Sequence, residues 1–79
     1  MAEARLAWQC RRGMLELDLL LSGFLENGYE QLNSIEKQVF TELLETADTE
    51  LLEYLMGRDV HKEARVQHVI EAIRKSLTP

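Results

Sequence analysis

The side chains best suited to catalysis or metal binding are one cysteine, two histidines and a group of charged residues near the N-terminus. A thiol or an imidazole acts as a nucleophile, a base or a metal ligand only with a partner at the correct spacing. Cys10 has no second cysteine to pair with. His61 and His68 would be separated by about 10.5 Å along a helix, which is too far to bind one ion. We therefore expect Cys10 to be a partly buried apolar side chain and the histidines to be solvated or capping residues.

The sequence also lacks the motifs that usually accompany catalysis. It has no glycine-rich phosphate loop, no nucleophile elbow and no H-E-x-x-H zinc motif. The serines Ser22, Ser34 and Ser76 are not beside a candidate base. Glu16 and Asp18 would lie about 200° apart around a helix and so would not face each other. With too few residues for a deep pocket, the chain is predicted to be a non-enzyme without a metal or cofactor of its own.

Arginines, a glycine and acids converge on one short stretch, residues 8–18. On a continuous helix, Arg12 and Glu16 would be one turn apart on the same side. Gly13 lies beside them, and a glycine inside a helix costs about 1 kcal/mol relative to alanine. One interpretation is a joint between two helices with a solvated Arg12–Glu16 pair, worth roughly 0.2–0.5 kcal/mol. The other is a docking patch, in which the bare Gly13 admits a partner's backbone. The residues alone favour the joint.

This stretch resembles the signature of the succinate dehydrogenase assembly factor family, whose members are small flavinylation factors. Residues 8–18 read W-Q-C-R-R-G-M-L-E-L-D, with the R-G-x-x-E string of the family at their centre. Three later strings are also similar: L-N-S-x-E at 32–36, F-x-x-L-L-E at 40–45 and D-x-x-L-x-x-Y-L-M-G at 48–57. The resemblance covers about residues 4–57. Tyr54 departs from it, because many members carry tryptophan there.

The resemblance implies a chaperone-like factor that binds the flavoprotein subunit of succinate dehydrogenase and promotes covalent attachment of FAD to that subunit. FAD would then be the cofactor of the client. The similar subunit of fumarate reductase is a second expected client. The implied contact has Arg12, Gly13 and Glu16 at its centre. Further implied contact residues are Arg5, Trp8, Arg11 and Asp18. The alternative function is an antitoxin-like regulatory module that binds a membrane toxin, and the identity of a co-purifying partner would separate the two.

Charge and composition restrict the partners further. The net charge is −5, and residues 13–53 alone carry −9. An acidic surface of this kind argues against nucleic-acid binding, which requires a basic face. No apolar run approaches the roughly 20 residues that cross a bilayer, and no signal-peptide pattern is recognisable. A single cysteine is typical of a reducing compartment, and we expect a cytoplasmic protein without membrane insertion. We expect a monomer, with weak self-association through an exposed Trp8 or Cys10 as the alternative.

The apolar spacing predicts an all-α fold, a compact five-helix bundle forming one domain over residues 1–79. The expected helices cover residues 2–12, 14–26, 33–45, 48–56 and 62–77. Gly28 is expected to adopt a left-handed cap, and Asn33 and Glu36 have the spacing of a capping box. Asp48 is expected to cap the fourth helix. Ile35 is expected to begin the buried stripe of the third.

Overall fold

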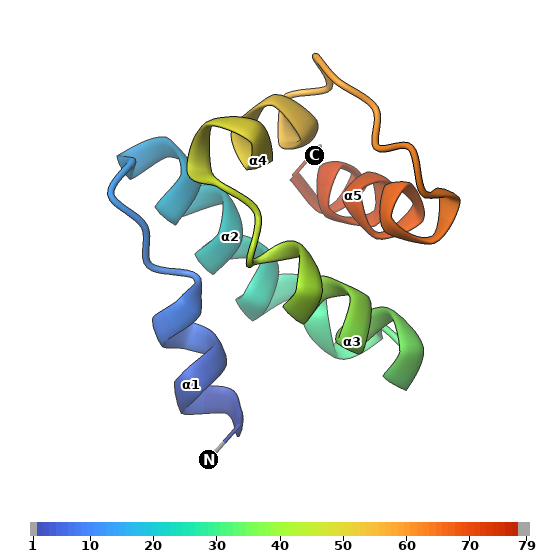
Figure 1. Cartoon of the computed structure of the whole chain (residues 1–79). Coiled ribbons are helices and arrows are strands. Elements are labelled where there is room, and N and C mark those ends of the chain that lie inside the picture. Colours follow the sequence, from blue (N-terminus) through green and yellow to red (C-terminus); the bar gives the residue numbers. More distant parts are fainter. Residues whose placement is uncertain (1, 78–79) are drawn as a thin grey trace.

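Apolar residues at helical spacing give five α-helices, with no strand in the part of the chain that the structure describes (Figure 1). The computed structural model describes the backbone of residues 2–77 and the side chains of residues 6–77. The helices are α1 (Ala2–Gln9), α2 (Leu15–Asn27), α3 (Ser34–Leu43), α4 (Asp48–Leu55) and α5 (Ala64–Leu77), with a 3-10 turn at Tyr29–Gln31. The predicted all-α, five-helix fold is confirmed. Among these described helices, none combines the length and apolar character needed to cross a membrane.

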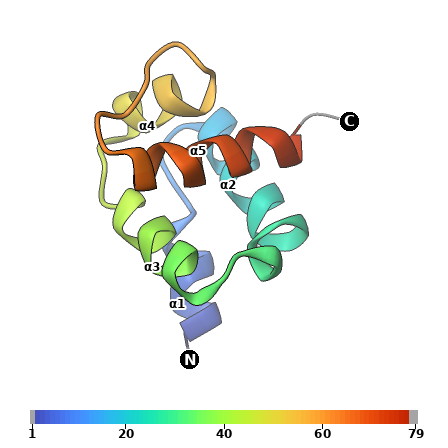
Figure 2. The same cartoon turned by 90° about the vertical axis from the view of Figure 1, so that its right-hand side faces the viewer.

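The last helix is the centre of the packing. α5 contacts α2, α3 and α4, and it lies across these three helices in the view of Figure 2. Its buried stripe consists of Val66, Val69, Ile70 and Ile73. In both views α1 lies on the side of the molecule away from α5 (Figures 1 and 2). Only Leu6 and the adjoining Cys10 anchor that end of the described chain in the hydrophobic core. The position of α1 therefore depends strongly on the residues that connect it to α2.

The capping box predicted at the start of α3 is present. The backbone N–H of Asn33 donates to Glu36 Oε1 at 2.9 Å, and the backbone N–H of Glu36 donates to Asn33 Oδ1 at 2.8 Å. The hydrogen bond from the Asn33 backbone is the main cause that lowers the pKa of the Glu36 carboxyl group, and the hydrogen bond with His68 lowers it further. His68 Nε2 lies 2.7 Å from Glu36 Oε2. The cap of α3 is thus also a polar connection to α5.

Two local expectations need correction. Gly28 has φ of −129° and is not left-handed. Instead, an added Cβ would lie 2.6 Å from Cε1 of Phe24, so close packing requires this glycine. Ile35 is 70% exposed rather than buried, because it lies in the first turn of α3, one turn before the buried Val39. Gly57, after α4, does adopt a left-handed conformation, with φ of 77°.

Candidate functional site

The motif stretch, residues 8–18, spans a break between two helices. α1 ends at Gln9 and α2 begins at Leu15, so residues 10–14 form a connection. The predicted extension of the first helix to Arg12 is therefore wrong, and the interpretation of Gly13 as part of a joint is confirmed. The Cys10 N–H still donates to the Leu6 carbonyl, at 3.1 Å, which closes the last turn of α1. After that bond the chain turns away from the α1 axis.

The side chain of Arg12 points into the protein from this joint. Its Nη1 donates to Asp48 Oδ1 at 3.1 Å, and its Nη2 donates to the backbone carbonyl of Leu44. The Arg12 side chain is only 15% exposed, and its Nε is buried without a hydrogen-bond partner. Leu44 directly follows α3 as its C-cap residue, and Asp48 is the first residue of α4. One guanidinium therefore fastens the α1–α2 connection to the α3–α4 connection, an arrangement that we call the Arg12 clamp.

The backbone of Arg12 is held as well. The Arg12 N–H donates to Oδ1 of Asp18, in the first turn of α2. Asp18 is half-buried, and a carboxylate in the first turn of a helix is also stabilised by the helix dipole. Two residues of the predicted contact, Arg12 and Asp18, thus have internal partners in this structure.

The expected Arg12–Glu16 arrangement does not occur. Arg12 precedes α2, whereas Glu16 lies in its first turn, so the two residues do not share a helix face. Among the described residues, the carboxylate paired with Arg12 is that of Asp48. A buried backbone carbonyl and a carboxylate together satisfy a guanidinium better than one solvated acid. Glu16 is left on the surface.

Four of the predicted contact residues lie on the outside of the joint. Gly13 is exposed, and an added Cβ would have no atom within 4 Å among those compared. Trp8 is 71% exposed, and the Arg11 guanidinium carbon lies 6.0 Å from the centre of its ring, a cation–π distance. Glu16 is exposed on α2. We call Trp8, Arg11, Gly13 and Glu16 the docking face, since they are the exposed residues at which the sequence predicts contact with a partner. The side chain of Arg5, also predicted, lies outside the described residues.

Cys10 is the innermost residue of the joint. It is 0% exposed, so it is more deeply buried than the sequence suggested. Burial raises the pKa of its thiol to about 11, with Arg12 lowering and Asp18 raising that value to a smaller extent. The thiol stays protonated at neutral pH, and a protonated thiol is a poor nucleophile and metal ligand. Cys10 accordingly serves as a small apolar core residue.

Sequence reasoning missed the role of Asp48. It was expected to cap α4, but the cap position belongs to Ala47 and carries no side-chain hydrogen bond. The Asp48 carboxylate, which is 32% exposed, points to Arg12 instead. The sequence gives little indication of this pairing, because Arg12 and Asp48 are 36 positions apart.

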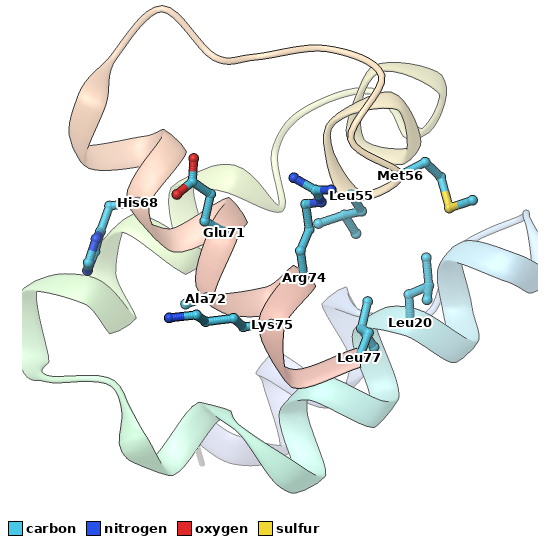
Figure 3. A pocket seen from close by; sticks show the side chains of 9 residues that line it. All are labelled: Leu20, Leu55, Met56, His68, Glu71, Ala72, Arg74, Lys75 and Leu77. Carbon is cyan, nitrogen blue, oxygen red and sulfur yellow. The ribbon is translucent and has the colours of Figure 1, made fainter. Parts of the chain in front are cut away.

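A second surface feature is an open groove between α2, α4 and α5 (Figure 3). Its apolar part is formed by Leu20, Leu55, Met56, Ala72 and Leu77. The charged side chains of Glu71, Arg74 and Lys75 come from α5 and point in different directions, so they do not converge on one ligand position (Figure 3). Within the described residues, no three metal-binding side chains come together.

Comparison with known proteins gives consistent matches over nearly the whole chain. A family model described as the flavinator of succinate dehydrogenase matches residues 4–77. A protein of Shewanella oneidensis named FAD assembly factor SdhE is 40% identical over 76 residues, which cover 96% of this chain and 93% of the relative.

Two further relatives carry the same name. The protein of Colwellia psychrerythraea is 38% identical over 75 residues, covering 95% of this chain and 82% of the relative. The protein of Coxiella burnetii is 36% identical over 75 residues, covering 95% and 92%. The matched regions include both the joint and the α3–α4 connection to which the joint is fastened.

Proposed function

The chain belongs to the family of succinate dehydrogenase flavinators, and from this premise we propose that it is an FAD assembly factor. It binds the flavoprotein subunit of succinate dehydrogenase and promotes covalent attachment of FAD to that subunit. The observation that carries the proposal is the match over residues 4–77, which includes the whole joint with its R-G-x-x-E string.

Within this function we assign different roles to the residues of the joint. The docking face contacts the flavoprotein: Gly13 allows close approach, and Glu16 offers a carboxylate to a cation on the partner. The exposure of Glu16 and the open space at Gly13 support this assignment. Arg12 and Asp18 position the docking face rather than forming its centre, which is supported by their internal hydrogen bonds. Arg5 and Trp8 extend the contact along α1.

The factor acts by binding one arrangement of the flavoprotein preferentially, and not by chemistry of its own side chains. A partner that binds one domain arrangement of the flavoprotein better than the others increases the population of that arrangement. If the favoured arrangement places the flavoprotein's histidine beside the 8α-methyl group of its FAD, the histidine would supply the nucleophile, and the flavin ring would take up the electron pair that the methyl carbon gives up as it loses a proton. No catalytic residue is then required on this chain, and FAD is the cofactor of the client. The high pKa of the buried Cys10 thiol agrees with a non-catalytic role.

Several further features belong to the same proposal. The flavoprotein subunit of fumarate reductase is a second client if its surface matches that of the dehydrogenase. The factor acts as a monomer in the cytoplasm, where the single cysteine stays reduced. It contacts neither nucleic acid nor the bilayer, in keeping with its acidic charge of −5.

The proposal is tested by co-expressing the flavoprotein subunit with the wild-type factor, with the Gly13→Arg variant, or alone. Flavin fluorescence in a denaturing gel measures covalently attached flavin, because free flavin is lost on denaturation. We expect strong fluorescence of the flavoprotein band only with the wild-type factor. Equal fluorescence with and without the factor would refute the function. Co-purification of a small membrane protein instead of the flavoprotein would favour the antitoxin-like alternative.

A further inference from the structure

Two leucines on the outer side of α2 are strongly exposed beside the docking face. Leu15 is 72% exposed and Leu19 is 65% exposed. They are four residues apart, so they are neighbours on the helix surface, and Glu16 is three residues from Leu19. The other side of the helix buries Leu17, Leu21 and Phe24. Leu15 and Leu19 therefore contribute nothing comparable to the core.

We propose that Leu15 and Leu19 form an apolar extension of the docking face that is covered by the flavoprotein subunit of the client. This inference rests on the proposed function. It adds Leu15, which occupies an unspecified position of the R-G-x-x-E string, and Leu19, which lies beyond the string. The partner chemistry that fits is an apolar hollow bordered by a basic side chain, which would receive the two leucines and Glu16 together. Apolar side chains next to a charged rim are the usual composition of such a contact.

The charge of α2 argues against a second copy of this chain as the occupant. The helix carries Glu16, Asp18 and Glu26 and has no basic residue. Two copies packed through the α2 surface would bring two acidic helices together, because Arg11, the basic residue of the docking face, lies in the joint beside Trp8 and not on α2. Like charges in an interface oppose association. A flavoprotein surface with an arginine or lysine at the edge of the hollow has no such repulsion.

The surface also offers a matched control. Ile35 is 70% exposed and lies on α3, so it has the same apolar character and exposure as the two leucines. It is not part of the α2 surface that carries Glu16. Glutamine suits a helix surface, so the substitutions Leu15→Gln, Leu19→Gln and Ile35→Gln should all leave the fold intact.

The experiment titrates the full-length factor and its three glutamine variants with purified flavoprotein subunit and measures affinity by calorimetry. Covalent flavin on the client is measured in parallel. We expect Leu19→Gln and Leu15→Gln each to weaken binding by roughly ten-fold or more, and Ile35→Gln to bind like the wild type.

Three results would overturn the inference. Wild-type affinity of both leucine variants, with Gly13→Arg still inactive, would refute the apolar extension and leave the proposed function standing. A wild-type factor that sediments as a dimer and becomes a monomer with Leu19→Gln would identify a second copy as the occupant. A wild-type factor that binds no flavoprotein would refute the proposed function and this inference together.

Discussion

The guanidinium of Arg12 and the carboxylate of Asp48 form an ion pair at 3.1 Å, although 36 positions separate them in the chain. The same guanidinium donates to the carbonyl of Leu44 at the end of α3. The joint that presents the docking face is thereby supported from the other half of the molecule. This relationship separates residues that shape the face from residues that form it, and the two groups should respond differently to substitution.

Removing either side chain of the Arg12 clamp should destabilise the protein. Arg12→Ala leaves the Leu44 carbonyl and the Asp48 carboxylate without their donor, so we expect a loss of about 1–3 kcal/mol in the free energy of unfolding. A double-mutant cycle with Asp48→Ala, measured by urea denaturation, should give a coupling energy of about 0.5–3 kcal/mol. Glu16→Ala is the control and should cost under about 0.5 kcal/mol, as exposed substitutions usually do. A coupling near zero would show that the ion pair contributes nothing to the fold.

Gly13→Arg should fold normally and fail to bind. A Cβ at Gly13 meets open space, and the residue has no positive φ, so the backbone accepts a side chain there. The large side chain would instead hold the partner's surface away from the joint. Circular dichroism should be nearly unchanged, while binding to the flavoprotein is lost. A marked loss of helicity would mean that Gly13 is required for the fold and would remove the basis for assigning it to the contact.

Glu16→Gln should reduce partner affinity without changing stability. Removing one charge from a desolvated contact commonly costs about 2–5 kcal/mol in binding free energy. Glu26→Gln is a suitable control, because Glu26 is an exposed acid on the same helix, near its other end. Glu16→Gln alone should lower both the affinity for the flavoprotein and the amount of flavin covalently attached to it. Equal losses for both variants would point to a general effect of net charge.

The buried thiol of Cys10 predicts a loss of stability in alkaline solution. Its pKa is raised from 9.0 to about 11, so the folded state keeps a proton that the unfolded chain releases. The contribution is fully present below pH 9 and is lost as the pH rises from 9 to about 11. The slope should be about 1.4 kcal/mol per pH unit within that window.

Cys10→Ala isolates this contribution, because the variant lacks the thiol and keeps every other ionisable group. The measurement is the free energy of unfolding from urea titrations at several pH values across the window. The difference between wild type and variant should be constant below pH 9 and shrink above it. Parallel profiles over the whole range would show that the thiol titrates normally in the folded protein.

Local patterns predicted the helices well. The apolar spacing of α2 predicts a buried stripe of Leu17, Leu20, Leu21, Phe24 and Leu25. Leu17, Leu21 and Phe24 are buried, and Leu20 and Leu25 are partly buried against the core. The Asn33–Glu36 capping box involves residues three apart, and both of its hydrogen bonds form. Such features depend on neighbours in sequence, so the sequence contains what is needed to predict them.

Features that depend on distant neighbours were not predictable in the same way. Arg12 has an acid four residues later, yet it pairs with Asp48, because the chain breaks at the joint and another connection lies beside it. Ile35 continues the apolar stripe of α3, yet its side chain stays exposed, while the neighbouring Glu36 in the same turn is the residue that contacts α5. The stripe of α2 likewise gave no indication that Leu15 and Leu19 form a second apolar surface. Each case depends on which elements meet in space.

The long sequence separation within the Arg12 clamp has a consequence for biogenesis. Leu44 and Asp48 follow Arg12 by 32 and 36 residues, so the joint lacks its support until the second half of the chain has been synthesised and has folded. A factor truncated before Leu44 would carry the complete R-G-x-x-E string but would lack both partners of the Arg12 side chain. Such fragments should compete poorly for the flavoprotein, and the clamp would thereby reserve the client for intact molecules.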